Sequence, residues 1–150
     1  MGVNLDDTGS VDDYLIVKQI PVSRRKEEIQ KPEVAIVIGS VGRTPERGDQ
    51  LAYICTDVYA VDEQALVVQD PAITTYCDPA LSAIVVISGT TGDSTFDKYQ
   101  EECRSYQSDF KAEKRILTTR REDALQAVTN KDVLAYKANK DLLRFVISND

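Results

Sequence analysis

The hydrophobic pattern changes in the middle of the chain from strand-like to helix-like. Residues Ala80–Ile87 form a mostly apolar run, which is followed by the glycine-containing loop Ser88–Ser94. After this loop, apolar and aromatic residues recur every three or four positions, which places them on one face of a helix. The stretch therefore predicts a strand, a turn and a helix. The residues on that face are Phe96, Tyr99, Cys103, Tyr106 and Phe110.

The first half of the chain is typical of strands. Tyr14–Val22 and Glu33–Ile38 are rich in β-branched residues, and Leu51–Val61 alternates with a period of two. We expect the second and third of these strands to form a long hairpin. Shorter strands are expected over Ala65–Val68 and Ile73–Cys77.

The C-terminal part is typical of helices. Arg121–Val128 and Lys131–Val146 carry apolar residues at helical spacing. Strands that come first and helices that come last indicate an α+β fold, with an antiparallel sheet followed by C-terminal helices. A chain of 150 residues is most simply one domain. Residues 1–11 contain few apolar side chains and are expected to be a flexible or interacting arm.

A competing interpretation starts from an internal similarity. Val34–Ser40 and Ala83–Gly89 each run from an apolar strand into a loop of small residues. If Asp49–Val61 were a helix, the chain would form a parallel sheet, and these loops would lie where α/β folds bind phosphates. The loops Gly39–Thr44 and Gly89–Thr95 would then bind a small ligand or nucleotide, as part of an enzyme. Tyr53–Tyr59 is rich in good strand formers and poor helix formers, so the antiparallel sheet remains the main prediction. Neither loop carries a Walker A or dinucleotide-binding motif, which favours plain turns.

Composition narrows the possible chemistry. The chain has no histidine, which removes histidine-based catalytic triads, and its three cysteines have no metal-like spacing. We therefore expect no enzyme, no cofactor and no metal, with Cys55, Cys77 and Cys103 as buried structural thiols. No apolar run approaches the roughly 18 residues that span a bilayer. The N-terminus lacks the order of a signal peptide, so a cytoplasmic protein with no membrane partner is expected.

The charge is unevenly distributed. The net charge is −7, and no basic residue lies between Arg47 and Lys98, which disfavours a simple nucleic-acid-binding protein. The acidic segment 48–97 leaves a further hypothesis, an acidic host-directed protein that imitates nucleic-acid charge. A basic cluster near the N-terminus predicts a solvated turn or, alternatively, a nucleic-acid contact. Its residues are Arg24, Arg25, Lys26 and Lys31.

The order of elements resembles the coat proteins of small single-stranded RNA bacteriophages. The resemblance rests on the hairpin Glu33–Val61, the strand that ends at Val85–Gly89 and the helix Phe96–Phe110. It implies a self-assembling virion subunit that is assembled in the host cytoplasm, with copies of itself as partners. Viral RNA would be a second partner, bound through the basic cluster. The assembly interface implied by the resemblance consists of Phe96, Tyr99, Tyr106 and Phe110.

Overall fold

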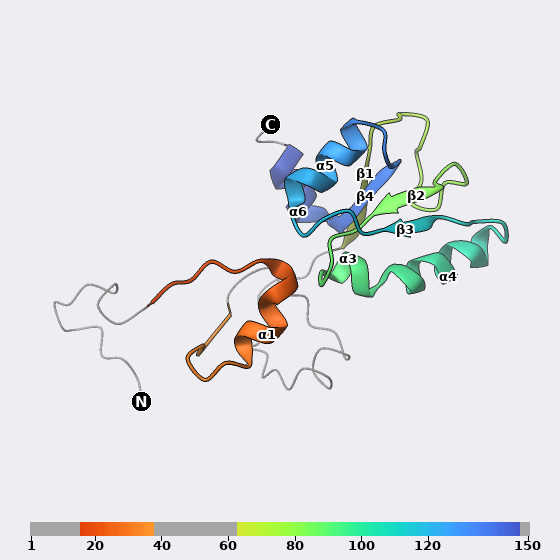
Figure 1. Cartoon of the computed structure of the whole chain (residues 1–150). Coiled ribbons are helices and arrows are strands. Elements are labelled where there is room, and N and C mark those ends of the chain that lie inside the picture. The colour runs from red at the N-terminus through yellow and green to blue at the C-terminus, as the bar shows by residue number, and fades with distance from the viewer. Residues whose placement is uncertain (1–15, 38–62, 148–150) are drawn as a thin grey trace.

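A computed structural model describes residues 16–37 and 63–147 of the chain. These residues form an α+β fold around a mixed four-stranded sheet with the order β1-β4-β2-β3. In Figure 1, α4 lies on one side of this sheet, whereas α5 and α6 lie on the other. The strands are β1 (Gln64–Val68), β2 (Ala83–Val85), β3 (Glu113–Arg115) and β4 (Ala135–Asn139).

The connections between the strands explain why the sheet is mixed. β2 pairs in parallel with both β3 and β4, whereas β1 pairs antiparallel with β4. Parallel neighbours need crossover segments, and helices supply them here. From β2 the chain passes through α3 (Thr91–Ser94) and α4 (Phe96–Tyr106) to β3. From β3 it continues through α5 (Arg121–Thr129) to β4, and α6 (Lys140–Ile147) follows.

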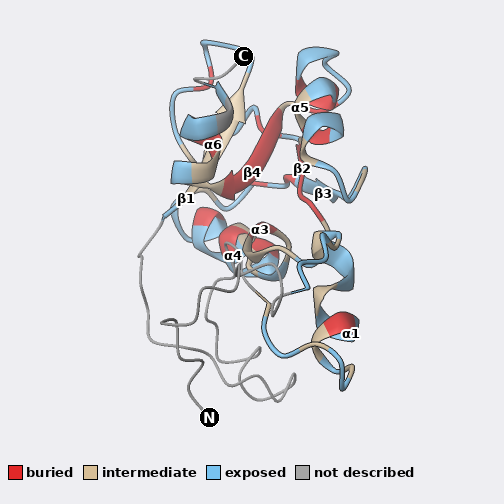
Figure 2. Ribbon diagram, turned by 90° about the vertical axis from the view of Figure 1, so that its left-hand side faces the viewer, coloured by how far each residue is buried: buried red, intermediate tan, exposed pale blue. Residues whose placement is uncertain are grey.

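The sheet has a buried core on each of its faces. Along β2 and the residues after it, Ile84 and Val86 face the first core, whereas Val85 and Ile87 face the second. Both faces are covered, so this strand reads as a continuous apolar run without alternation. Figure 2 shows the resulting buried centre of the sheet between α4 and α5. The first core includes Phe96, Tyr99, Cys103 and Phe110, and the second includes Ala124, Val128, Tyr136 and Leu143.

The sequence correctly predicted the α+β class, but its antiparallel sheet is only partly right. The pair β1–β4 is antiparallel, and β2 makes parallel pairs that the main prediction did not contain. The expected strand at Ala65–Val68, the strand that starts at Ala83, the helix after the glycine loop and the helix at Arg121–Val128 are confirmed.

The predicted helix Lys131–Val146 is wrong in its first half. That half contains β4, a central strand whose residues from Ala135 to Ala138 are all buried. A strand covered on both faces shows no alternation of polar and apolar residues, so its pattern was mistaken for part of the following helix α6. β3 was missed for the opposite reason, because its three residues are charged and exposed.

The predicted N-terminal strands do not form within the part of the chain that the structure describes. Residues 16–37 contain a 3₁₀ helix, η2 (Val22–Arg24), and the short helix α1 (Arg25–Ile29), and no strand. Ile73–Cys77 is a turn region as well. The strand Leu51–Val61, the tip of the expected hairpin and the arm 1–11 lie outside the described residues.

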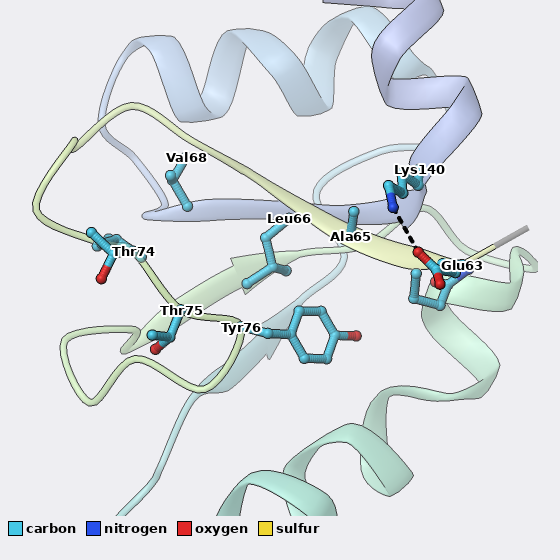
Figure 3. Close-up of a pocket in the computed structure, with 10 residues that line it drawn as sticks. Glu63, Ala65, Leu66, Val68, Thr74, Thr75, Tyr76 and Lys140 are labelled. Carbon is cyan, nitrogen blue, oxygen red and sulfur yellow. Dashed lines mark hydrogen bonds and ion pairs between the residues drawn. The ribbon is translucent and has the colours of Figure 1, made fainter.

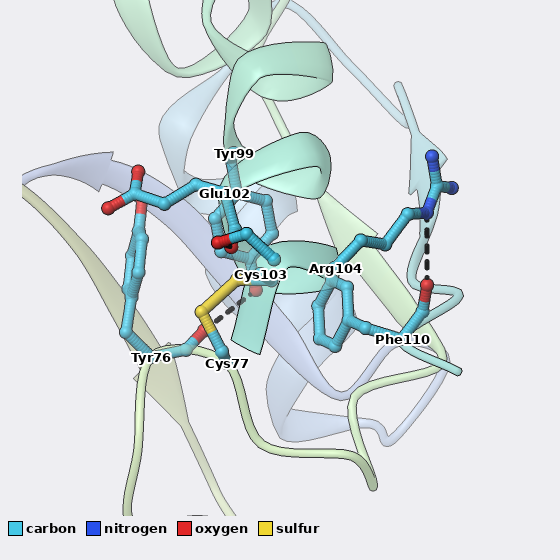
Figure 4. Close-up of a disulfide and its surroundings, with 8 residues drawn as sticks. Tyr76, Cys77, Tyr99, Glu102, Cys103, Arg104 and Phe110 are labelled. Carbon is cyan, nitrogen blue, oxygen red and sulfur yellow. Dashed lines mark hydrogen bonds between the residues drawn. A yellow bond between two sulfur atoms is a disulfide. The ribbon is translucent and has the colours of Figure 1, made fainter. Parts of the chain in front are cut away.

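The expectation of free cysteine thiols is wrong for two of the three cysteines. Cys77 and Cys103 form a disulfide that joins the turn region before β2 to the buried face of α4 (Figure 4). Helical spacing placed Cys103 on that face but could not show which segment would meet it. Cys55 lies outside the described residues.

Candidate functional site

Three chain segments meet at the edge of the sheet where the parallel strands end. The loop Ser88–Thr95 follows β2, and Asn139–Lys140 lies at the end of β4. Because β1 is antiparallel to β4, its first residues, Glu63–Gln64, reach the same edge. The chain leaves β2 toward the core under α4 and leaves β4 toward the opposite core, which contains Leu143 of α6. Open α/β sheets bind ligands at such a divergence.

The loop after β2 is held in shape by its own side chains. Gly89 adopts a φ of 75°, which glycine tolerates without steric cost. The hydroxyl of Thr90 donates to the Ile87 carbonyl at 2.6 Å and accepts from the Asp93 amide, which caps α3. The Asp93 carboxylate accepts in turn from the Gly89 amide at 3.1 Å. The loop therefore has a defined conformation at the sheet edge.

The N-terminal segment also reaches this loop. A Cβ atom added to Gly89 would lie 3.5 Å from Ser23 Cα and 3.6 Å from the Val22 carbonyl oxygen. The backbone of η2 thus packs directly against the loop. Glycine is favoured at position 89 by its positive φ, because a Cβ atom there would make only ordinary van der Waals contacts.

A polar network lies beneath the loop. The Gln64 side-chain amide donates to Asn139 Oδ1 at 2.7 Å, and Lys137 Nζ donates to Gln64 Oε1 at 3.2 Å. Lys137 is buried on β4, and this burial lowers the pKa of its ammonium to about 8. At the rim of the same edge, Lys140 forms a 2.7 Å ion pair with Glu63.

A hollow of about 320 Å³ runs beside β1 from this edge (Figure 3). Leu66 and Val68 of β1 supply an apolar wall, and the segment from Thr74 to Tyr76 supplies a polar wall opposite. The Glu63–Lys140 ion pair lies at one end. The volume is at the lower limit of what small-molecule sites in proteins use.

The disulfide and two tyrosines fix the polar wall of this hollow. The ring centroids of Tyr76 and Tyr99 are 4.7 Å apart, and the Tyr99 hydroxyl donates to the Tyr76 carbonyl at 2.8 Å. The Cys77–Cys103 bond is the adjacent link between the same two segments (Figure 4). Burial raises the pKa of both tyrosines, so their hydroxyls stay protonated in the physiological range.

The residues predicted to form an assembly interface have mostly internal positions. Phe96, Tyr99 and Phe110 are each at most 2% exposed and are covered by their own chain. Tyr99 lies edge-on to both phenylalanines, with centroids 5.7 and 5.6 Å away. Only Tyr106 points outward, with 76% of its surface exposed. The ring-bearing side of α4 therefore packs on the sheet of its own subunit.

The basic cluster that was considered for nucleic acid lies on η2, on α1 and two residues beyond α1. Arg24 and Lys31 both bind the buried Glu28 carboxylate, at 3.1 and 2.6 Å. Hydrogen bonds from Lys31 and then Lys18 lower the pKa of Glu28 to about 2. Two of the four cluster residues, Arg24 and Lys31, are thus engaged within the chain. A contact of Arg24, Arg25, Lys26 or Lys31 with nucleic acid stays a prediction.

One of the two loops considered for ligand binding is described. Gly89–Thr95 lies at the carboxyl end of a parallel strand, as the competing interpretation expected, whereas Gly39–Thr44 lies outside the described residues. Within the acidic segment, Asp70 and Asp78 accept hydrogen bonds from the Ala72 and Ala80 amides, so these two carboxylates stabilise turns.

Sequence reasoning missed the side chains beneath the loop. Gln64, Lys137 and Asn139 were not singled out, because β4 was predicted to be helical. The available signal was a single lysine within the otherwise apolar stretch Val133–Ala138. Within residues 16–37 and 63–147, no cluster of potential metal ligands is present, and no helix is long and apolar enough to cross a bilayer.

Comparison with known proteins identifies the fold. No protein-family model matches the sequence, and no curated protein matches it either. Solved structures do match. An "ABC transporter / periplasmic binding protein from Brucella ovis with glutathione bound" aligns with a TM-score of 0.70 and 17% identity, over 82% of this chain and 37% of that one. This chain shares the fold of a part of that protein.

Two further solved structures agree. An ancestral arginine-binding protein bound to arginine aligns with a TM-score of 0.66 and 21% identity, over 88% of this chain and 55% of that one. A solute receptor for L-cysteine from Neisseria gonorrhoeae aligns with a TM-score of 0.54 and 18% identity, over 81% of this chain and 45% of that one. The chain therefore spans less than two thirds of the length of each matched protein.

These matches correct the resemblance to phage coat proteins. The similar structures are solute-binding proteins, and the hairpin-first order that suggested a coat protein is not borne out. Residues 33–37 form no strand, the sheet is mixed, and the α4 rings lie within their own subunit. The predictions of a virion subunit, of partners in self-assembly and viral RNA, and of a virion location are wrong on the same evidence.

Proposed function

We propose that this protein binds a small solute at the edge of the sheet where β2 and β4 end. The observation that carries the proposal is the structural similarity over more than four fifths of the chain to three proteins described with glutathione, arginine and L-cysteine. Amino acids and short peptides are therefore the first solute class to test.

The geometry of this edge supports the same position. The Glu63–Lys140 pair and the side chain of Gln64 provide donors and acceptors at one end of the hollow beside β1. Lys137, which binds both Gln64 and Thr95, connects the loop Ser88–Thr95 to this end. A zwitterionic solute needs both kinds of polar group, with an apolar wall for its side chain. Leu66 and Val68 supply such a wall.

The length of the chain has a consequence for affinity. It covers between 37% and 55% of the matched proteins, so we propose that residues 63–147 supply one lobe and one wall of the site. A solute held by one wall has fewer contacts than a solute enclosed by two. We therefore expect binding by this chain in the micromolar to millimolar range. That residues 1–150 form a single domain stays a prediction.

The disulfide supports a location outside the cytoplasm. Stable structural disulfides form in oxidising compartments such as the bacterial periplasm. The Cys77–Cys103 bond joins a wall of the proposed site to α4, and Cys103 is fully buried. We propose that the protein binds its solute in such an oxidising compartment and does not convert it chemically.

A titration followed by NMR tests this function. L-arginine, L-cysteine and glutathione are added separately to the oxidised, full-length chain, with ATP as the test of the nucleotide alternative. We expect at least one of the three solutes to shift the amide signals of Gly89–Thr95 and Gln64 saturably. The signals of α5, which packs on the other face, serve as the internal control and should stay in place.

Two outcomes would reject the proposal. One is the absence of any saturable shift with the three solutes up to millimolar concentrations. The other is a saturable response to ATP alone at the loop, which would favour a nucleotide site instead. A thermal shift that rises with solute concentration gives an independent check, because a ligand that binds only the folded state stabilises it.

A further inference from the structure

Lys137 is an unusual residue for the centre of a sheet. Glu28 and Lys137 are the charged side chains that are buried among the described residues, and Lys137 is 1% exposed. Glu28 is surrounded by cations, whereas no described carboxylate pairs with the Lys137 ammonium. A buried charge without a counter-charge is costly, so its hydrogen bonds have to compensate for lost water.

The ammonium has three oxygen partners. Lys137 Nζ donates to Thr95 Oγ1 at 2.9 Å, to Gln64 Oε1 at 3.2 Å and to the Gly92 carbonyl at 3.3 Å. A protonated lysine has three N–H donors and no acceptor, so the number of partners equals the number of donors. The neutral amine has two donors and would leave one partner without its hydrogen bond.

Each partner is fixed as an acceptor by another contact. The Thr95 hydroxyl donates its proton to the Thr91 carbonyl at 2.7 Å. The Gln64 amide nitrogen donates to Asn139 Oδ1, which turns Oε1 toward Lys137. The third partner is a backbone carbonyl, which can only accept. These three acceptors therefore match the three donors of the ammonium better than the two donors of the neutral amine.

The same lysine holds the loop through its backbone. A Cβ atom on Gly92 would lie 2.6 Å from the Lys137 carbonyl oxygen, so Gly92 packs directly on β4. The side chain and the main chain of Lys137 thus both contact the loop, at Gly92 and Thr95. Gln64, the third partner, lines the hollow beside β1.

We propose that Lys137 is a positioning residue for the loop Ser88–Thr95, and that its three donated hydrogen bonds hold the loop on β4 in the shape that binds solute. This inference rests on the proposed function for its effect on affinity, but its effect on the loop does not depend on a ligand. Loss of one proton from Lys137 removes one of the three hydrogen bonds and loosens the loop.

The titration of Lys137 can be separated from that of its neighbours. Burial lowers the pKa of Lys137 to about 8, whereas burial raises the pKa of Tyr99, whose ring lies 5.8 Å from Nζ, and of Tyr76. Tyr136, on the opposite face of β4, also has a raised pKa, of about 12. The remaining charged groups at this edge are already paired: Asp93 with Lys114, and Glu63 with Lys140.

The sign of the pH effect differs between stability and binding. The pKa of Lys137 is lower in the folded chain, about 8, than its ordinary 10.5, so the unfolded chain holds the proton more tightly. The free energy of unfolding therefore rises as pH increases from about 8 to about 10.5. Affinity and loop order should fall over the same range. A lysine with a purely structural role would not make these two quantities move in opposite directions.

The first experiment needs no ligand and no variant. We expect the amide signals of Gly92 and Thr95 in the wild-type chain to titrate together with a midpoint near pH 8. Hydrogen exchange of the Ser94 and Thr95 amides, which bond to the Thr90 and Thr91 carbonyls, should be faster in Lys137→Met than in the wild type. The exposed Lys98→Met on α4 is the matched control and should leave both unchanged. Equal exchange rates of the Ser94 and Thr95 amides in Lys137→Met and in the wild type would overturn the proposal.

The second experiment measures affinity for L-arginine, L-cysteine and glutathione. Lys137→Met should bind about tenfold more weakly than the wild type near pH 6.5, and this ratio should fall to about threefold near pH 9.5. Comparison at equal pH cancels the titration of the solute itself. A ratio that does not change with pH would overturn the role in binding. If none of the three solutes binds the wild type while the loop still titrates, the proposed function fails and the positioning role stands.

Discussion

The two described parts of this protein are stabilised in different ways. Every buried apolar side chain of the described residues lies in the sheet body, residues 63–147. In the N-terminal segment, residues 16–37, the buried side chain is Glu28, and its partners are Lys18, Arg24 and Lys31. Ile16 and Val17 of the same segment are 99% and 82% exposed. The body is organised around apolar cores and the segment around a carboxylate.

This difference predicts different responses to solution conditions. Apolar burial is not weakened by ionic screening, whereas ion pairs with exposed partners weaken as the Debye length shortens. The segment should therefore loosen in acid or at high salt while the body stays folded. Because the segment packs against the loop at Gly89, its loosening would expose the candidate site.

Removal of a ring from the body should produce the largest effect. Phe96→Ala removes a 1% exposed ring that packs on Tyr99, and should lower the free energy of unfolding by about 3–5 kcal/mol. Chemical denaturation of the full chain measures the change. Tyr106→Ala, on the same helix but 76% exposed, is the matched control and should cost at most about 0.5 kcal/mol. Equal losses would mean that α4 packs on the sheet through a different face.

The disulfide should rank next. Its cysteines are 26 residues apart, for which the loss of chain entropy in the unfolded state corresponds to about 3.5 kcal/mol of stability. Replacement of both Cys77 and Cys103 by serine should lower the free energy of unfolding, measured by chemical denaturation, by this amount. A reducing agent should shift the wild type toward the variant and leave the variant unchanged. A wild type that does not respond to a reducing agent after unfolding and refolding would contradict a stabilising bridge.

The sequence correctly predicted the elements that bury only one face, because their hydrophobic residues then recur with a helical or strand period. α4 and α5 each bury one face, and β1 is bounded by turn residues, so their periodicity identifies them. β4 has no such pattern, because its neighbours β1 and β2 and both cores surround it. The strands expected around residues 16–37 were wrong because β-branched residues make a strand only where a sheet edge is available to pair with it.

The candidate site was predictable in part. Glycine, serine and threonine after an apolar strand indicated the loop Ser88–Thr95 as a possible ligand loop. The groups that support it come from positions far away in the sequence: Gln64 and Lys137 are 73 residues apart. No local pattern connects them, because the antiparallel pair β1–β4 alone brings them together.

A smaller loss of stability is expected from a substitution in the loop Ser88–Thr95 where it packs on β4. In Gly92→Ala the new methyl group would lie 2.6 Å from the Lys137 carbonyl oxygen, which is backbone and cannot rotate away. The cost should be about 1–3 kcal/mol, together with displacement of the loop signals in NMR spectra. Gly89→Ala is the comparison: its new methyl has an ordinary 3.5 Å contact, and its φ of 75° costs about 1–2 kcal/mol.

The clash and the side-chain contact can be separated with a double variant. Lys137→Met removes the ammonium but keeps the carbonyl oxygen, so it should not relieve the cost of Gly92→Ala. Recovery of stability in the double variant would show that the side chain, and not the backbone of β4, limits the space at Gly92.

The smallest effect on stability should come from protonation of Glu28 in the N-terminal segment. Hydrogen bonds from Lys31 and Lys18 lower the pKa of Glu28 from its ordinary 4.5 to about 2. A carboxyl with a lowered folded-state pKa stabilises the fold above its ordinary pKa, and this contribution is lost as pH falls from about 4.5 toward 2. The NMR signals of α1 should therefore lose dispersion in this range before those of α5, and added salt should have the same direction of effect.

Matched variants determine whether Glu28 is the group responsible. Glu28→Gln should loosen α1 at neutral pH and remove its acid transition, because the amide keeps the shape but not the charge that binds three cations. Glu27→Gln changes a neighbour that is 71% exposed and has a single 3.9 Å ion pair with Arg24, so it should leave the transition in place. If α1 and α5 lose their signals together at every pH and salt concentration, the segment is held by packing on the body and not by its own charges.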